Sequence, residues 1–327
     1  MGTCVIGFRE NKPDNGMLGE SPAFQSALRS ARLVAGTDVT ALILGESGTG
    51  KELLARMIHR ESRRAEGPWV TVNCAALPTD LVESELFGYR RGAFTGAQAD
   101  HVGRIAQAHG GTLFLDEIAE LPLAAQGKLL RFLEYGECQA LGSPRVETVD
   151  VRVLAATHQD LRARVDEGAF RADLFYRLHV IPLELPPLRE RDDDVLLLLD
   201  HFVQALSGQH GVDAPVFARG LRRRLARYAW PGNIRELRNL VERCVVLLHG
   251  RRIGEDDLPG EWLQVPQAGS PELHWKLPAD GVSLEAVEAQ LINQALERTE
   301  GNRSRAARLL GLTRDTLLYR MKKHAIS

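Results

Sequence analysis

Short apolar runs alternate with longer amphipathic segments between Thr40 and Leu185. The short runs are rich in β-branched residues, which is typical of buried strands. The longer segments repeat apolar residues three and four positions apart, which is typical of helices. This alternation predicts an α/β fold in which a parallel sheet is covered by helices. The expected strands are Thr40–Leu44, Trp69–Asn73, Thr112–Leu115, Val151–Ala155 and Val180–Leu185, and the expected helices are Lys51–Glu66, Ala124–Tyr135 and Phe170–Leu178.

The strand pattern disappears from Glu190 to about Leu258, where the amphipathic segments Val195–Leu206, Leu221–Tyr228 and Ile234–Leu248 predict a small helical subdomain. Residues 259–281 hold four prolines and three glycines, which is linker composition. Another helical pattern covers Leu284–Arg298, and two shorter helices are expected after it. The expected parts are a short N-terminal segment (1–16), an α/β subdomain (17–188), a helical subdomain (189–258), a linker (259–281) and an all-helical domain (282–327).

A glycine-rich phosphate-binding motif, GESGTGK, follows the first expected strand and opens the next helix. Glycines let successive backbone N–H groups turn inward, and the helix N-terminus adds partial positive charge. The lysine would reach the β- and γ-phosphates of a nucleotide. The alternative is a plain strand-to-helix turn, which the spacing and context disfavour. Glu52 stands where a Ser or Thr would hold Mg²⁺. The candidate nucleotide-binding residues are Gly45, Glu46, Ser47, Gly48, Thr49, Gly50, Lys51 and Glu52.

Asp116 and Glu117 end the expected strand that begins at Thr112. Acids at the carboxyl edge of a parallel sheet can face a nucleotide on the neighbouring loop. Asp116 would then bind Mg²⁺, directly or through water, and Glu117 would polarise the attacking water. Alone, the pair would more simply begin a helix. A phosphate loop upstream in the same sheet favours the catalytic interpretation.

Residues 92–97 read GAFTGA, an uncharged segment with two hinge glycines around one aromatic residue. Such a segment suits an exposed loop that presents a side chain to a partner. From the residues alone, an ordinary turn with a buried phenylalanine is the simpler interpretation.

The C-terminus is basic, although the whole chain carries a net charge of −2. Residues 301–327 hold seven Arg or Lys and one Asp, so this end is +6 and the remainder is −8. Gly311 between two short helical patterns predicts a helix-turn-helix that binds DNA. A helical hairpin for dimerisation is the alternative. The candidate DNA-binding residues are Arg303, Arg305, Thr313, Arg314, Asp315, Thr316, Tyr319, Arg320, Lys322 and Lys323.

The composition suits a folded protein with a substantial core, since 44% of the residues are hydrophobic and 26% are charged. No apolar run approaches the length of a membrane span, and the N-terminus lacks a signal-peptide pattern. Four cysteines lie far apart without a CxxC pair. We expect reduced thiols in a cytoplasmic protein rather than disulfides or a zinc site.

Several motifs occur in one order along residues 17–258: the phosphate loop ending in Lys-Glu, GAFTGA, GGTLFLDE, FRADLFYRL, LPPLRER and WPGNIRELRN. Together they resemble the AAA+ domain of bacterial enhancer-binding proteins, which activate RNA polymerase carrying sigma-54. Glu52 is the residue usual to that family at its position. The C-terminal segment resembles the Fis-type DNA-binding domain of the same activators.

The resemblance implies further roles. Asn73 matches an asparagine that holds the catalytic glutamate until ATP is sensed. Thr157 and His158 fall at the first sensor, and Arg235 falls at the second. Arg171 and Arg177 match arginines that reach the nucleotide of the next subunit, although a surface charge is the commoner fate of an arginine. The loop of Gly92, Ala93, Phe94, Thr95, Gly96 and Ala97 would grip sigma-54.

The resemblance also implies ATP and Mg²⁺ as ligands, a hexameric ring built from dimers, and an inverted-repeat DNA site bound by paired chains. About 16 residues precede Met17, too few for a sensory domain. A part of a longer regulator is one alternative. The chain resembles the stand-alone class typified by the phage-shock operon activator, and another member of that class stays open. A separate inhibitory protein would then restrain it. Two alternatives remain open: a regulator of this family that does not act through sigma-54, and an AAA+ unfoldase or helicase.

Overall fold

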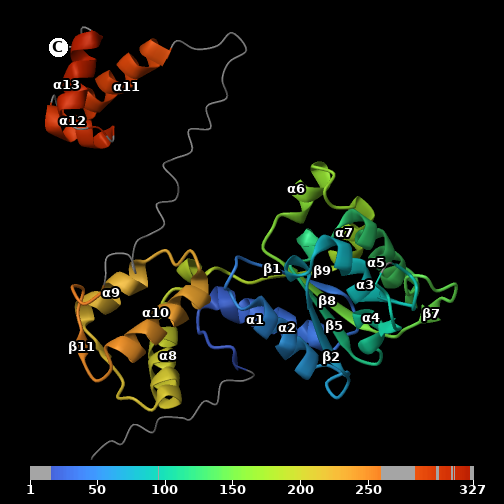
Figure 1. The fold of residues 1–327 in the computed structure, drawn as a ribbon. Coiled ribbons are helices and arrows are strands. Elements are labelled where there is room, and N and C mark those ends of the chain that lie inside the picture. Colours follow the sequence, from blue (N-terminus) through green and yellow to red (C-terminus); the bar gives the residue numbers. More distant parts are fainter. Residues whose placement is uncertain are drawn as a thin grey trace, which may run out of the picture. The chain divides into compact units, whose positions relative to one another are not determined.

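The computed structural model describes residues 16–94, 96–258, 284–299, 302–310, 312 and 314–324. The chain divides into two compact units, Met1–Pro266 and Gln267–Ser327 (Figure 1). Within the described residues, no helix combines the length and the apolar character that a membrane span requires.

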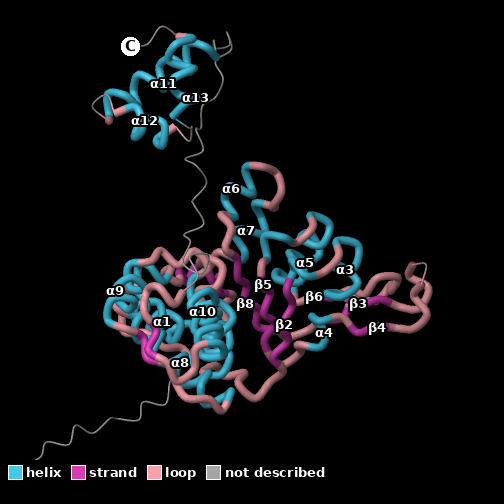
Figure 2. The backbone as a smooth tube through the Cα atoms, turned by 60° about the vertical axis from the view of Figure 1, so that its left-hand side comes forward, coloured by secondary structure: helices cyan, strands magenta, loops and turns pink. Residues whose placement is uncertain are grey.

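A five-stranded sheet forms the centre of the first unit, with the strand order β2-β5-β8-β1-β9 and parallel pairing throughout. Every residue of β8, the middle strand, is buried, as expected for a parallel sheet that is covered on both faces. Figure 2 shows these strands lying between helices. The strands are β1 (Ala41–Leu44), β2 (Trp69–Asn73), β5 (Thr112–Asp116), β8 (Arg152–Thr157) and β9 (Ile181–Glu184).

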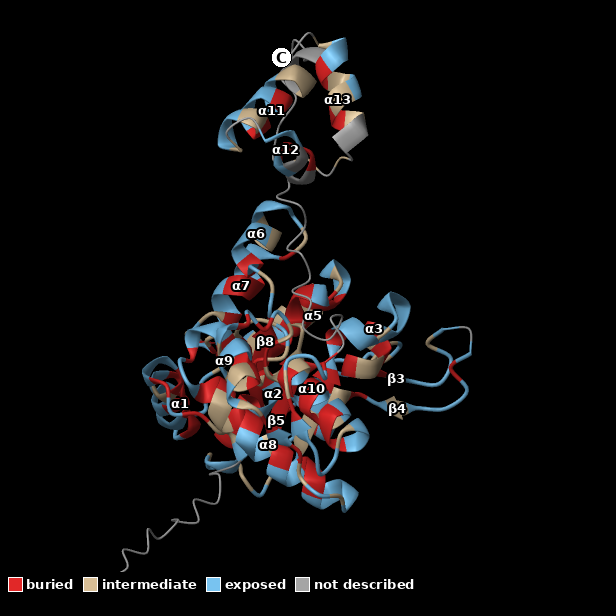
Figure 3. Cartoon of the chain, turned by 90° about the vertical axis from the view of Figure 1, so that its left-hand side faces the viewer, coloured by how far each residue is buried: buried red, intermediate tan, exposed pale blue. Residues whose placement is uncertain are grey.

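Alternate residues of the strands feed two separate cores. Leu113 and Leu115 of β5 pack with one set of helices, α3, α5 and α7, whereas Phe114 packs with α1 and α2 on the opposite face. This separation follows from the two-residue period of a strand. Figure 3 shows buried residues concentrated in β5 and β8. The helices of this subdomain are α1 (Pro22–Ala35), α2 (Lys51–Arg60), α3 (Thr79–Phe87), α4 (Arg104–Gln107), α5 (Leu123–Tyr135), α6 (Leu161–Asp166) and α7 (Ala172–Leu178).

A helical lid follows the sheet. It consists of α8 (Asp194–His210), α9 (Arg219–Arg227) and α10 (Asn233–Leu247), with a parallel ribbon of β10 (Val216–Phe217) and β11 (Arg252–Ile253). Its own core is centred on the fully buried Trp230, whose Nε1–H donates to the carbonyl oxygen of Leu225 at 2.9 Å.

Two short antiparallel pairs and three 3₁₀ turns complete the first unit. The pair β3 and β4 encloses the GAFTGA segment, and the pair β6 and β7 follows α5. The bounds are β3 (Gly88–Tyr89), β4 (His101–Val102), β6 (Glu137–Cys138), β7 (Glu147–Thr148), η2 (Cys74–Ala76), η3 (Ile118–Glu120) and η4 (Leu188–Glu190).

The second unit contains α11 (Leu284–Arg298), α12 (Arg303–Leu309) and α13 (Arg314–Lys323). Small residues of α12 allow close packing, because Ala306 and Ala307 are buried against α11 and α13. Leu317 and Met321 of α13 face this core.

The expected strands are confirmed, but three local expectations were incomplete or wrong. Helix α2 ends at Arg60 rather than Glu66. There Ser62 donates its hydroxyl hydrogen to the carbonyl oxygen of His59 and accepts from the N–H of Arg64, and such side-chain bonds compete with helix continuation. The helices α1, α3, α4 and α6 and the two short antiparallel pairs were not predicted. The lid contains the ribbon of β10 and β11, where no strand was expected.

Candidate functional site

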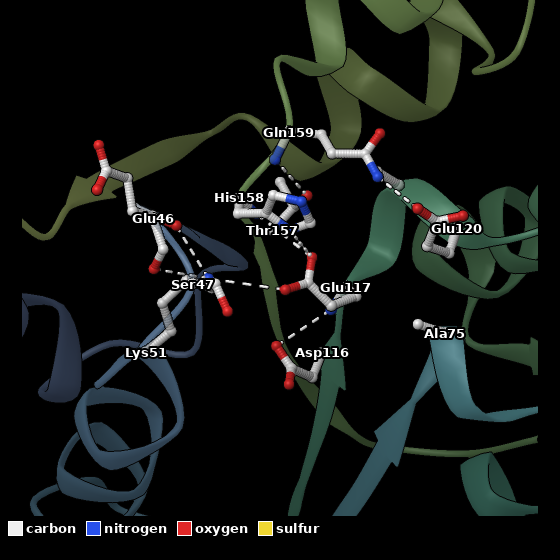
Figure 4. A network of polar contacts seen from close by, with 12 residues as sticks. Glu46, Ser47, Lys51, Ala75, Asp116, Glu117, Glu120, Thr157, His158 and Gln159 are labelled. Carbon is white, nitrogen blue, oxygen red and sulfur yellow. Dashed lines mark hydrogen bonds and ion pairs between the residues drawn. The ribbon is translucent and has the colours of Figure 1, made fainter. Parts of the chain in front are cut away.

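The candidate residues lie at the carboxyl ends of three neighbouring strands of the sheet. The parallel strands β5, β8 and β1 end at Asp116, Thr157 and Leu44, and Leu44 lies in register with Thr157. The phosphate loop, residues 45–50, follows β1. Figure 4 shows Lys51, Glu117 and His158 converging at this edge. The fold therefore brings the phosphate loop, the acidic pair and the first-sensor candidates Thr157 and His158 to the same edge of the sheet.

The phosphate loop has the backbone that its glycines permit. Gly48 and Gly50 have φ values of 81° and 102°, a left-handed region that other residues rarely adopt. A Cβ atom on Gly48 would lie 2.3 Å from the carbonyl oxygen of Gly232 in the lid. Helix α2 begins immediately at Lys51, so its unpaired N–H groups open onto the loop.

Lys51 is only 7% exposed and lies at the centre of the site. Its Nζ donates to the carbonyl oxygens of Gly45 at 2.9 Å and Glu46 at 3.3 Å. It also lies 3.7 Å from Oε1 of Glu117. Burial lowers the pKa of Lys51, and the charges of Glu117 and Asp116 oppose that shift. The lysine is thus a desolvated cation held beside the acidic pair.

Glu117 is held at a fixed position by its surroundings. Its backbone is left-handed, with a φ of 51°, a conformation that often marks functional sites in non-glycine residues. Its Oε2 lies 2.7 Å from Nδ1 of His158. The neighbouring Asp116 has a raised pKa, first because of burial and then because of the negative charge of Glu117. The site therefore concentrates negative charge that a cation would relieve.

Asn73 and Thr157 lie at the same edge but make local contacts. Asn73 pairs in register with Asp116 across β2 and β5. Its Oδ1 accepts from the N–H groups of Ala75 at 3.0 Å and Ala76 at 3.2 Å, and so caps η2. The buried Thr157 accepts from the N–H of Gln159 through its hydroxyl oxygen. The direct contact of His158 with Glu117 was not apparent from the sequence.

The lid docks onto the outer side of the phosphate loop through Asn233. This residue is fully buried and left-handed, with a φ of 50°. Its Nδ2 donates to the carbonyl oxygen of Ser47 at 3.0 Å and to Oε2 of Glu46 at 3.1 Å. Its Oδ1 accepts from the N–H of Leu188 at 2.8 Å. One amide therefore joins the phosphate loop, the hinge before α8 and the start of α10.

Two arginines reinforce the same junction. Arg189 forms a forked ion pair with Glu46, at 2.6 and 2.8 Å. Arg235, the second-sensor candidate, donates to the hydroxyl oxygen of Ser47 at 3.0 Å. Neither Arg189 nor Asn233 was identified from the sequence, although both lie within recognised motifs. A cavity of about 370 Å³ opens beside the loop, lined by Lys51, Glu52, Asp116, Glu117, Arg235 and Arg238 among others.

Arg171 and Arg177 lie away from this cavity. Arg171 pairs with Asp173 at 2.8 Å on the surface. Arg177 donates to the carbonyl oxygen of Leu133 at 2.8 and 3.1 Å, near the C-terminal end of α5. Both side chains belong to other surface hollows of the described residues. Within one chain, the fold does not bring these arginines to the phosphate loop.

The GAFTGA segment lies on a projecting hairpin and contacts the turn before β7. Phe94 is 40% exposed and packs edge-on against Tyr89, with ring centroids 5.0 Å apart. Gly92 and Gly96 have positive φ values, as hinge glycines permit. Arg90 pairs with Asp100 at 2.7 Å, and its N–H donates to the carbonyl oxygen of Leu141. Thr95 lies outside the described residues.

In the second unit, the candidate DNA-binding residues differ in how exposed they are and in whether they form ion pairs. Arg303, Arg305, Tyr319, Lys322 and Lys323 are exposed, whereas Thr316 is partly buried. Arg320 forms an ion pair with Glu288 of α11, and His324 lies 3.0 Å from the same carboxylate. These contacts fix the end of α13 against α11. Thr313 and the side chains of Arg314 and Asp315 lie outside the described residues.

The sheet order, the phosphate loop on β1, the acidic end of β5 and the helical lid define a P-loop NTPase of the AAA+ class. Comparison with family models gives three matches. The sigma-54 interaction domain matches residues 17–184, the AAA+ ATPase lid domain matches residues 189–274, and the Fis family of bacterial regulatory proteins matches residues 283–324. The chain therefore belongs to the family of sigma-54-dependent transcriptional activators.

Individual relatives agree with this membership. The chain is 48% identical over 309 residues to the transcriptional regulatory protein ZraR of Escherichia coli K12, covering 94% of this chain and 68% of ZraR. It is 45% identical over 331 residues to the DNA-binding transcriptional regulator NtrC of Azospirillum brasilense, covering 94% and 69%. The structure of NtrX from Brucella abortus in complex with ATP superposes with a TM-score of 0.70 at 34% identity, covering 94% and 69%.

The predicted function is thus confirmed. The chain is an AAA+ ATPase and transcriptional activator that acts on the sigma-54 polymerase and binds DNA through a Fis-type helix-turn-helix. Its AAA+ domains make it a nucleotide-binding protein. The likeness to the phage-shock activator in particular stays a prediction.

Proposed function

We propose that ATP is hydrolysed in the cavity between the phosphate loop and the lid. The backbone N–H groups of residues 45–50 would cradle the phosphates, and Lys51 would neutralise charge on the β- and γ-phosphates. Glu117 would polarise the attacking water. The observation that carries this proposal is the position of the Glu117 carboxylate, between Lys51 at 3.7 Å and His158 at 2.7 Å.

Mg²⁺ is the cation that we propose for this site, and when bound it would screen the charge of the phosphates. Asp116 is the residue that would hold it, directly or through water. In support, the carboxyl group of Asp116 is partly buried beside Glu117, and both features raise its pKa. Glu52 pairs with Arg56 at 3.2 Å instead, so we propose that Glu52 contributes only to the rim of the cavity.

We propose that the complete site forms between subunits of a ring, by family likeness a hexamer. Arg171 and Arg177 would stabilise charge on the γ-phosphate of a neighbouring chain. Their distance from the cavity of their own chain supports this role. Arg235 and Thr157 would sense the nucleotide, and Asn73 would hold Glu117 in another nucleotide state. In the present structure Asn73 caps η2.

We propose that residues 92–97 grip sigma-54 and that residues 282–327 bind an inverted-repeat DNA site as paired chains. The exposure of Phe94 and the exposed basic side chains of α12 and α13 support these assignments. The domain limits predicted from the sequence, with the ATPase subdomain at 17–188 and the lid at 189–258, belong to this proposal. We also propose that the protein is cytoplasmic and that a separate inhibitory protein restrains it.

The experiment for the proposed catalytic role is the substitution Glu117→Gln. The variant keeps its size but loses the negative charge that polarises water. We expect nucleotide binding within about twofold of wild type and a fall in kcat of about 10²- to 10⁴-fold. Ordinary turnover by Glu117→Gln would disprove the assigned role.

A further inference from the structure

The lid helix α9 carries an unusual density of positive charge. Its sequence RGLRRRLAR has five arginines and no acidic residue. Leu221 and Leu225 are fully buried in the lid core, and Tyr228 follows on the same side. At 100° per residue, these positions fix the inward direction of the helix. Arg219, Arg223 and Arg227 lie on the opposite side of the helix, with Arg223 nearest to its middle.

These three arginines, which we name the outer stripe, differ from the two arginines that flank them. Arg222 forms a forked ion pair with Asp200, and Arg224 lies 3.7 Å from Glu255. The members of the outer stripe are exposed. Within the part of the chain that the structure describes, none of the three has an ion pair or a side-chain hydrogen bond. The local carboxylates therefore neutralise the flanks and leave the stripe charged.

The spacing of the outer stripe has an energetic cost. Like charges four residues apart destabilise a helix. The stripe contains two such pairs in a chain whose net charge is −2. Four residues span about 6 Å of helix, so the stripe presents a row of guanidinium groups along one line. Guanidinium groups bind phosphate oxygens through paired hydrogen bonds.

We propose that the outer stripe of α9 is a second DNA-contact surface, which binds the phosphate backbone of double-stranded DNA without reading its sequence. The helix-turn-helix of the same chain binds DNA, so the chain that carries the stripe is already attached to double-stranded DNA. A covalent link raises the effective concentration of DNA near the lid. Contacts to phosphate oxygens carry no direct sequence information, so a stripe that binds the backbone would add affinity rather than specificity.

The test is the salt dependence of DNA binding by the full chain. Each phosphate contact contributes about 0.9 to the slope of log K against log salt. The variant Arg219→Gln/Arg223→Gln/Arg227→Gln should therefore lose about 2.7 from the slope. Its deficit relative to wild type should grow about 40-fold as salt falls from 200 to 50 mM. Glutamine is a good helix former, so α9 should remain folded.

Two matched variants make this test specific. Arg29→Gln/Arg60→Gln/Arg145→Gln removes the same charge from exposed positions on other elements, and its slope should equal that of wild type. Lysine at all three stripe positions keeps the charge and should keep the slope. Equal slopes for the two glutamine variants would overturn the proposal. The proposal would also be overturned if the stripe variant kept the wild-type slope of log K against log salt but lost open-complex formation. The stripe would then contact protein rather than DNA.

Discussion

The carboxylate of Glu117 and the imidazole of His158 meet at 2.7 Å, although the two residues lie 41 positions apart in the chain. They directly follow the neighbouring parallel strands β5 and β8, which end at Asp116 and Thr157. The contact orients the group that we propose to polarise water. His158 therefore links the end of β8 to the carboxylate that we propose to be catalytic.

Removing this contact should slow hydrolysis without weakening nucleotide binding. A hydrogen bond to a charged group contributes about 1.5–3 kcal/mol, so His158→Ala should lower kcat about 10- to 100-fold. His158→Asn places an amide donor near the same point and should recover part of the loss. The measurement is steady-state ATPase kinetics together with nucleotide titration. If His158→Ala turns over like wild type, Glu117 does not need the imidazole.

Asn233 should be required for nucleotide affinity, because its amide holds the lid against Ser47 and Glu46. Asn233→Ala leaves buried groups unpaired, and we expect the free energy of unfolding to fall by about 1–3 kcal/mol. We also expect the dissociation constant for ATP to rise about tenfold, or about 1.4 kcal/mol. Thermal unfolding and nucleotide titration measure the two effects.

Two further variants separate backbone strain from hydrogen bonding. Asn233→Gly tolerates the positive φ and should regain part of the stability but none of the nucleotide affinity. Gln204→Ala, at an exposed position of α8 outside the lining of the cavity, should leave both quantities unchanged. Wild-type affinity in Asn233→Ala would show that the lid docks without this amide.

Asp116 should limit the stability of the nucleotide-free protein at neutral pH. Its folded-state pKa is raised above 3.8, because of burial and then Glu117. Between 3.8 and the folded-state pKa, the folded state holds the proton more tightly than the unfolded state. Stability is therefore lost as pH rises through this interval. Asp116→Asn cannot ionise and should unfold at a higher temperature than wild type at pH 7.5.

The difference in unfolding temperature between Asp116→Asn and wild type should shrink as the pH is lowered toward 4, because wild-type Asp116 then takes up its proton. Asp256→Asn, at an exposed position with no ion pair among the described residues, should show no such advantage. A lower unfolding temperature for Asp116→Asn at pH 7.5 would contradict the sign of the shift. The variant should also lose ATP hydrolysis.

The arginines of α7 should act across a subunit boundary. Lys51→Ala and Arg177→Ala should each be inactive alone, and a mixture should regain part of the ATPase rate at mixed interfaces. The rate per subunit of wild type should rise with protein concentration. Arg177 also binds the carbonyl oxygen of Leu133, so the unfolding temperature of Arg177→Ala is a necessary control. A mixture without rescue would argue against trans arginines.

Local pattern explains which parts of this protein could be predicted. The strands and the phosphate loop are encoded by neighbouring residues, so their positions follow from alternation and from GESGTGK. The contacts of Glu117 with His158, of Glu46 with Arg189 and of Glu46 with Asn233 join residues 41, 143 and 187 positions apart. No local pattern contains such pairs. The hydrogen bonds of Asn73 to Ala75 and Ala76 could not be predicted either. The family resemblance suggests a role for this residue, but it does not give the conformation of its side chain.

The most direct test of the central claim asks whether ATP hydrolysis can be separated from open-complex formation. Thr95 lies in GAFTGA, between Phe94 and Gly96, and neither of these neighbours lines the cavity beside the phosphate loop. We expect Thr95→Ala to keep ATP hydrolysis and DNA binding close to wild type and to lose open-complex formation by the sigma-54 polymerase. The measurement is open-complex formation in vitro with ATP and a promoter that carries the binding site. Open complexes at the wild-type level with Thr95→Ala would contradict the claim that ATP hydrolysis acts on sigma-54 through this loop.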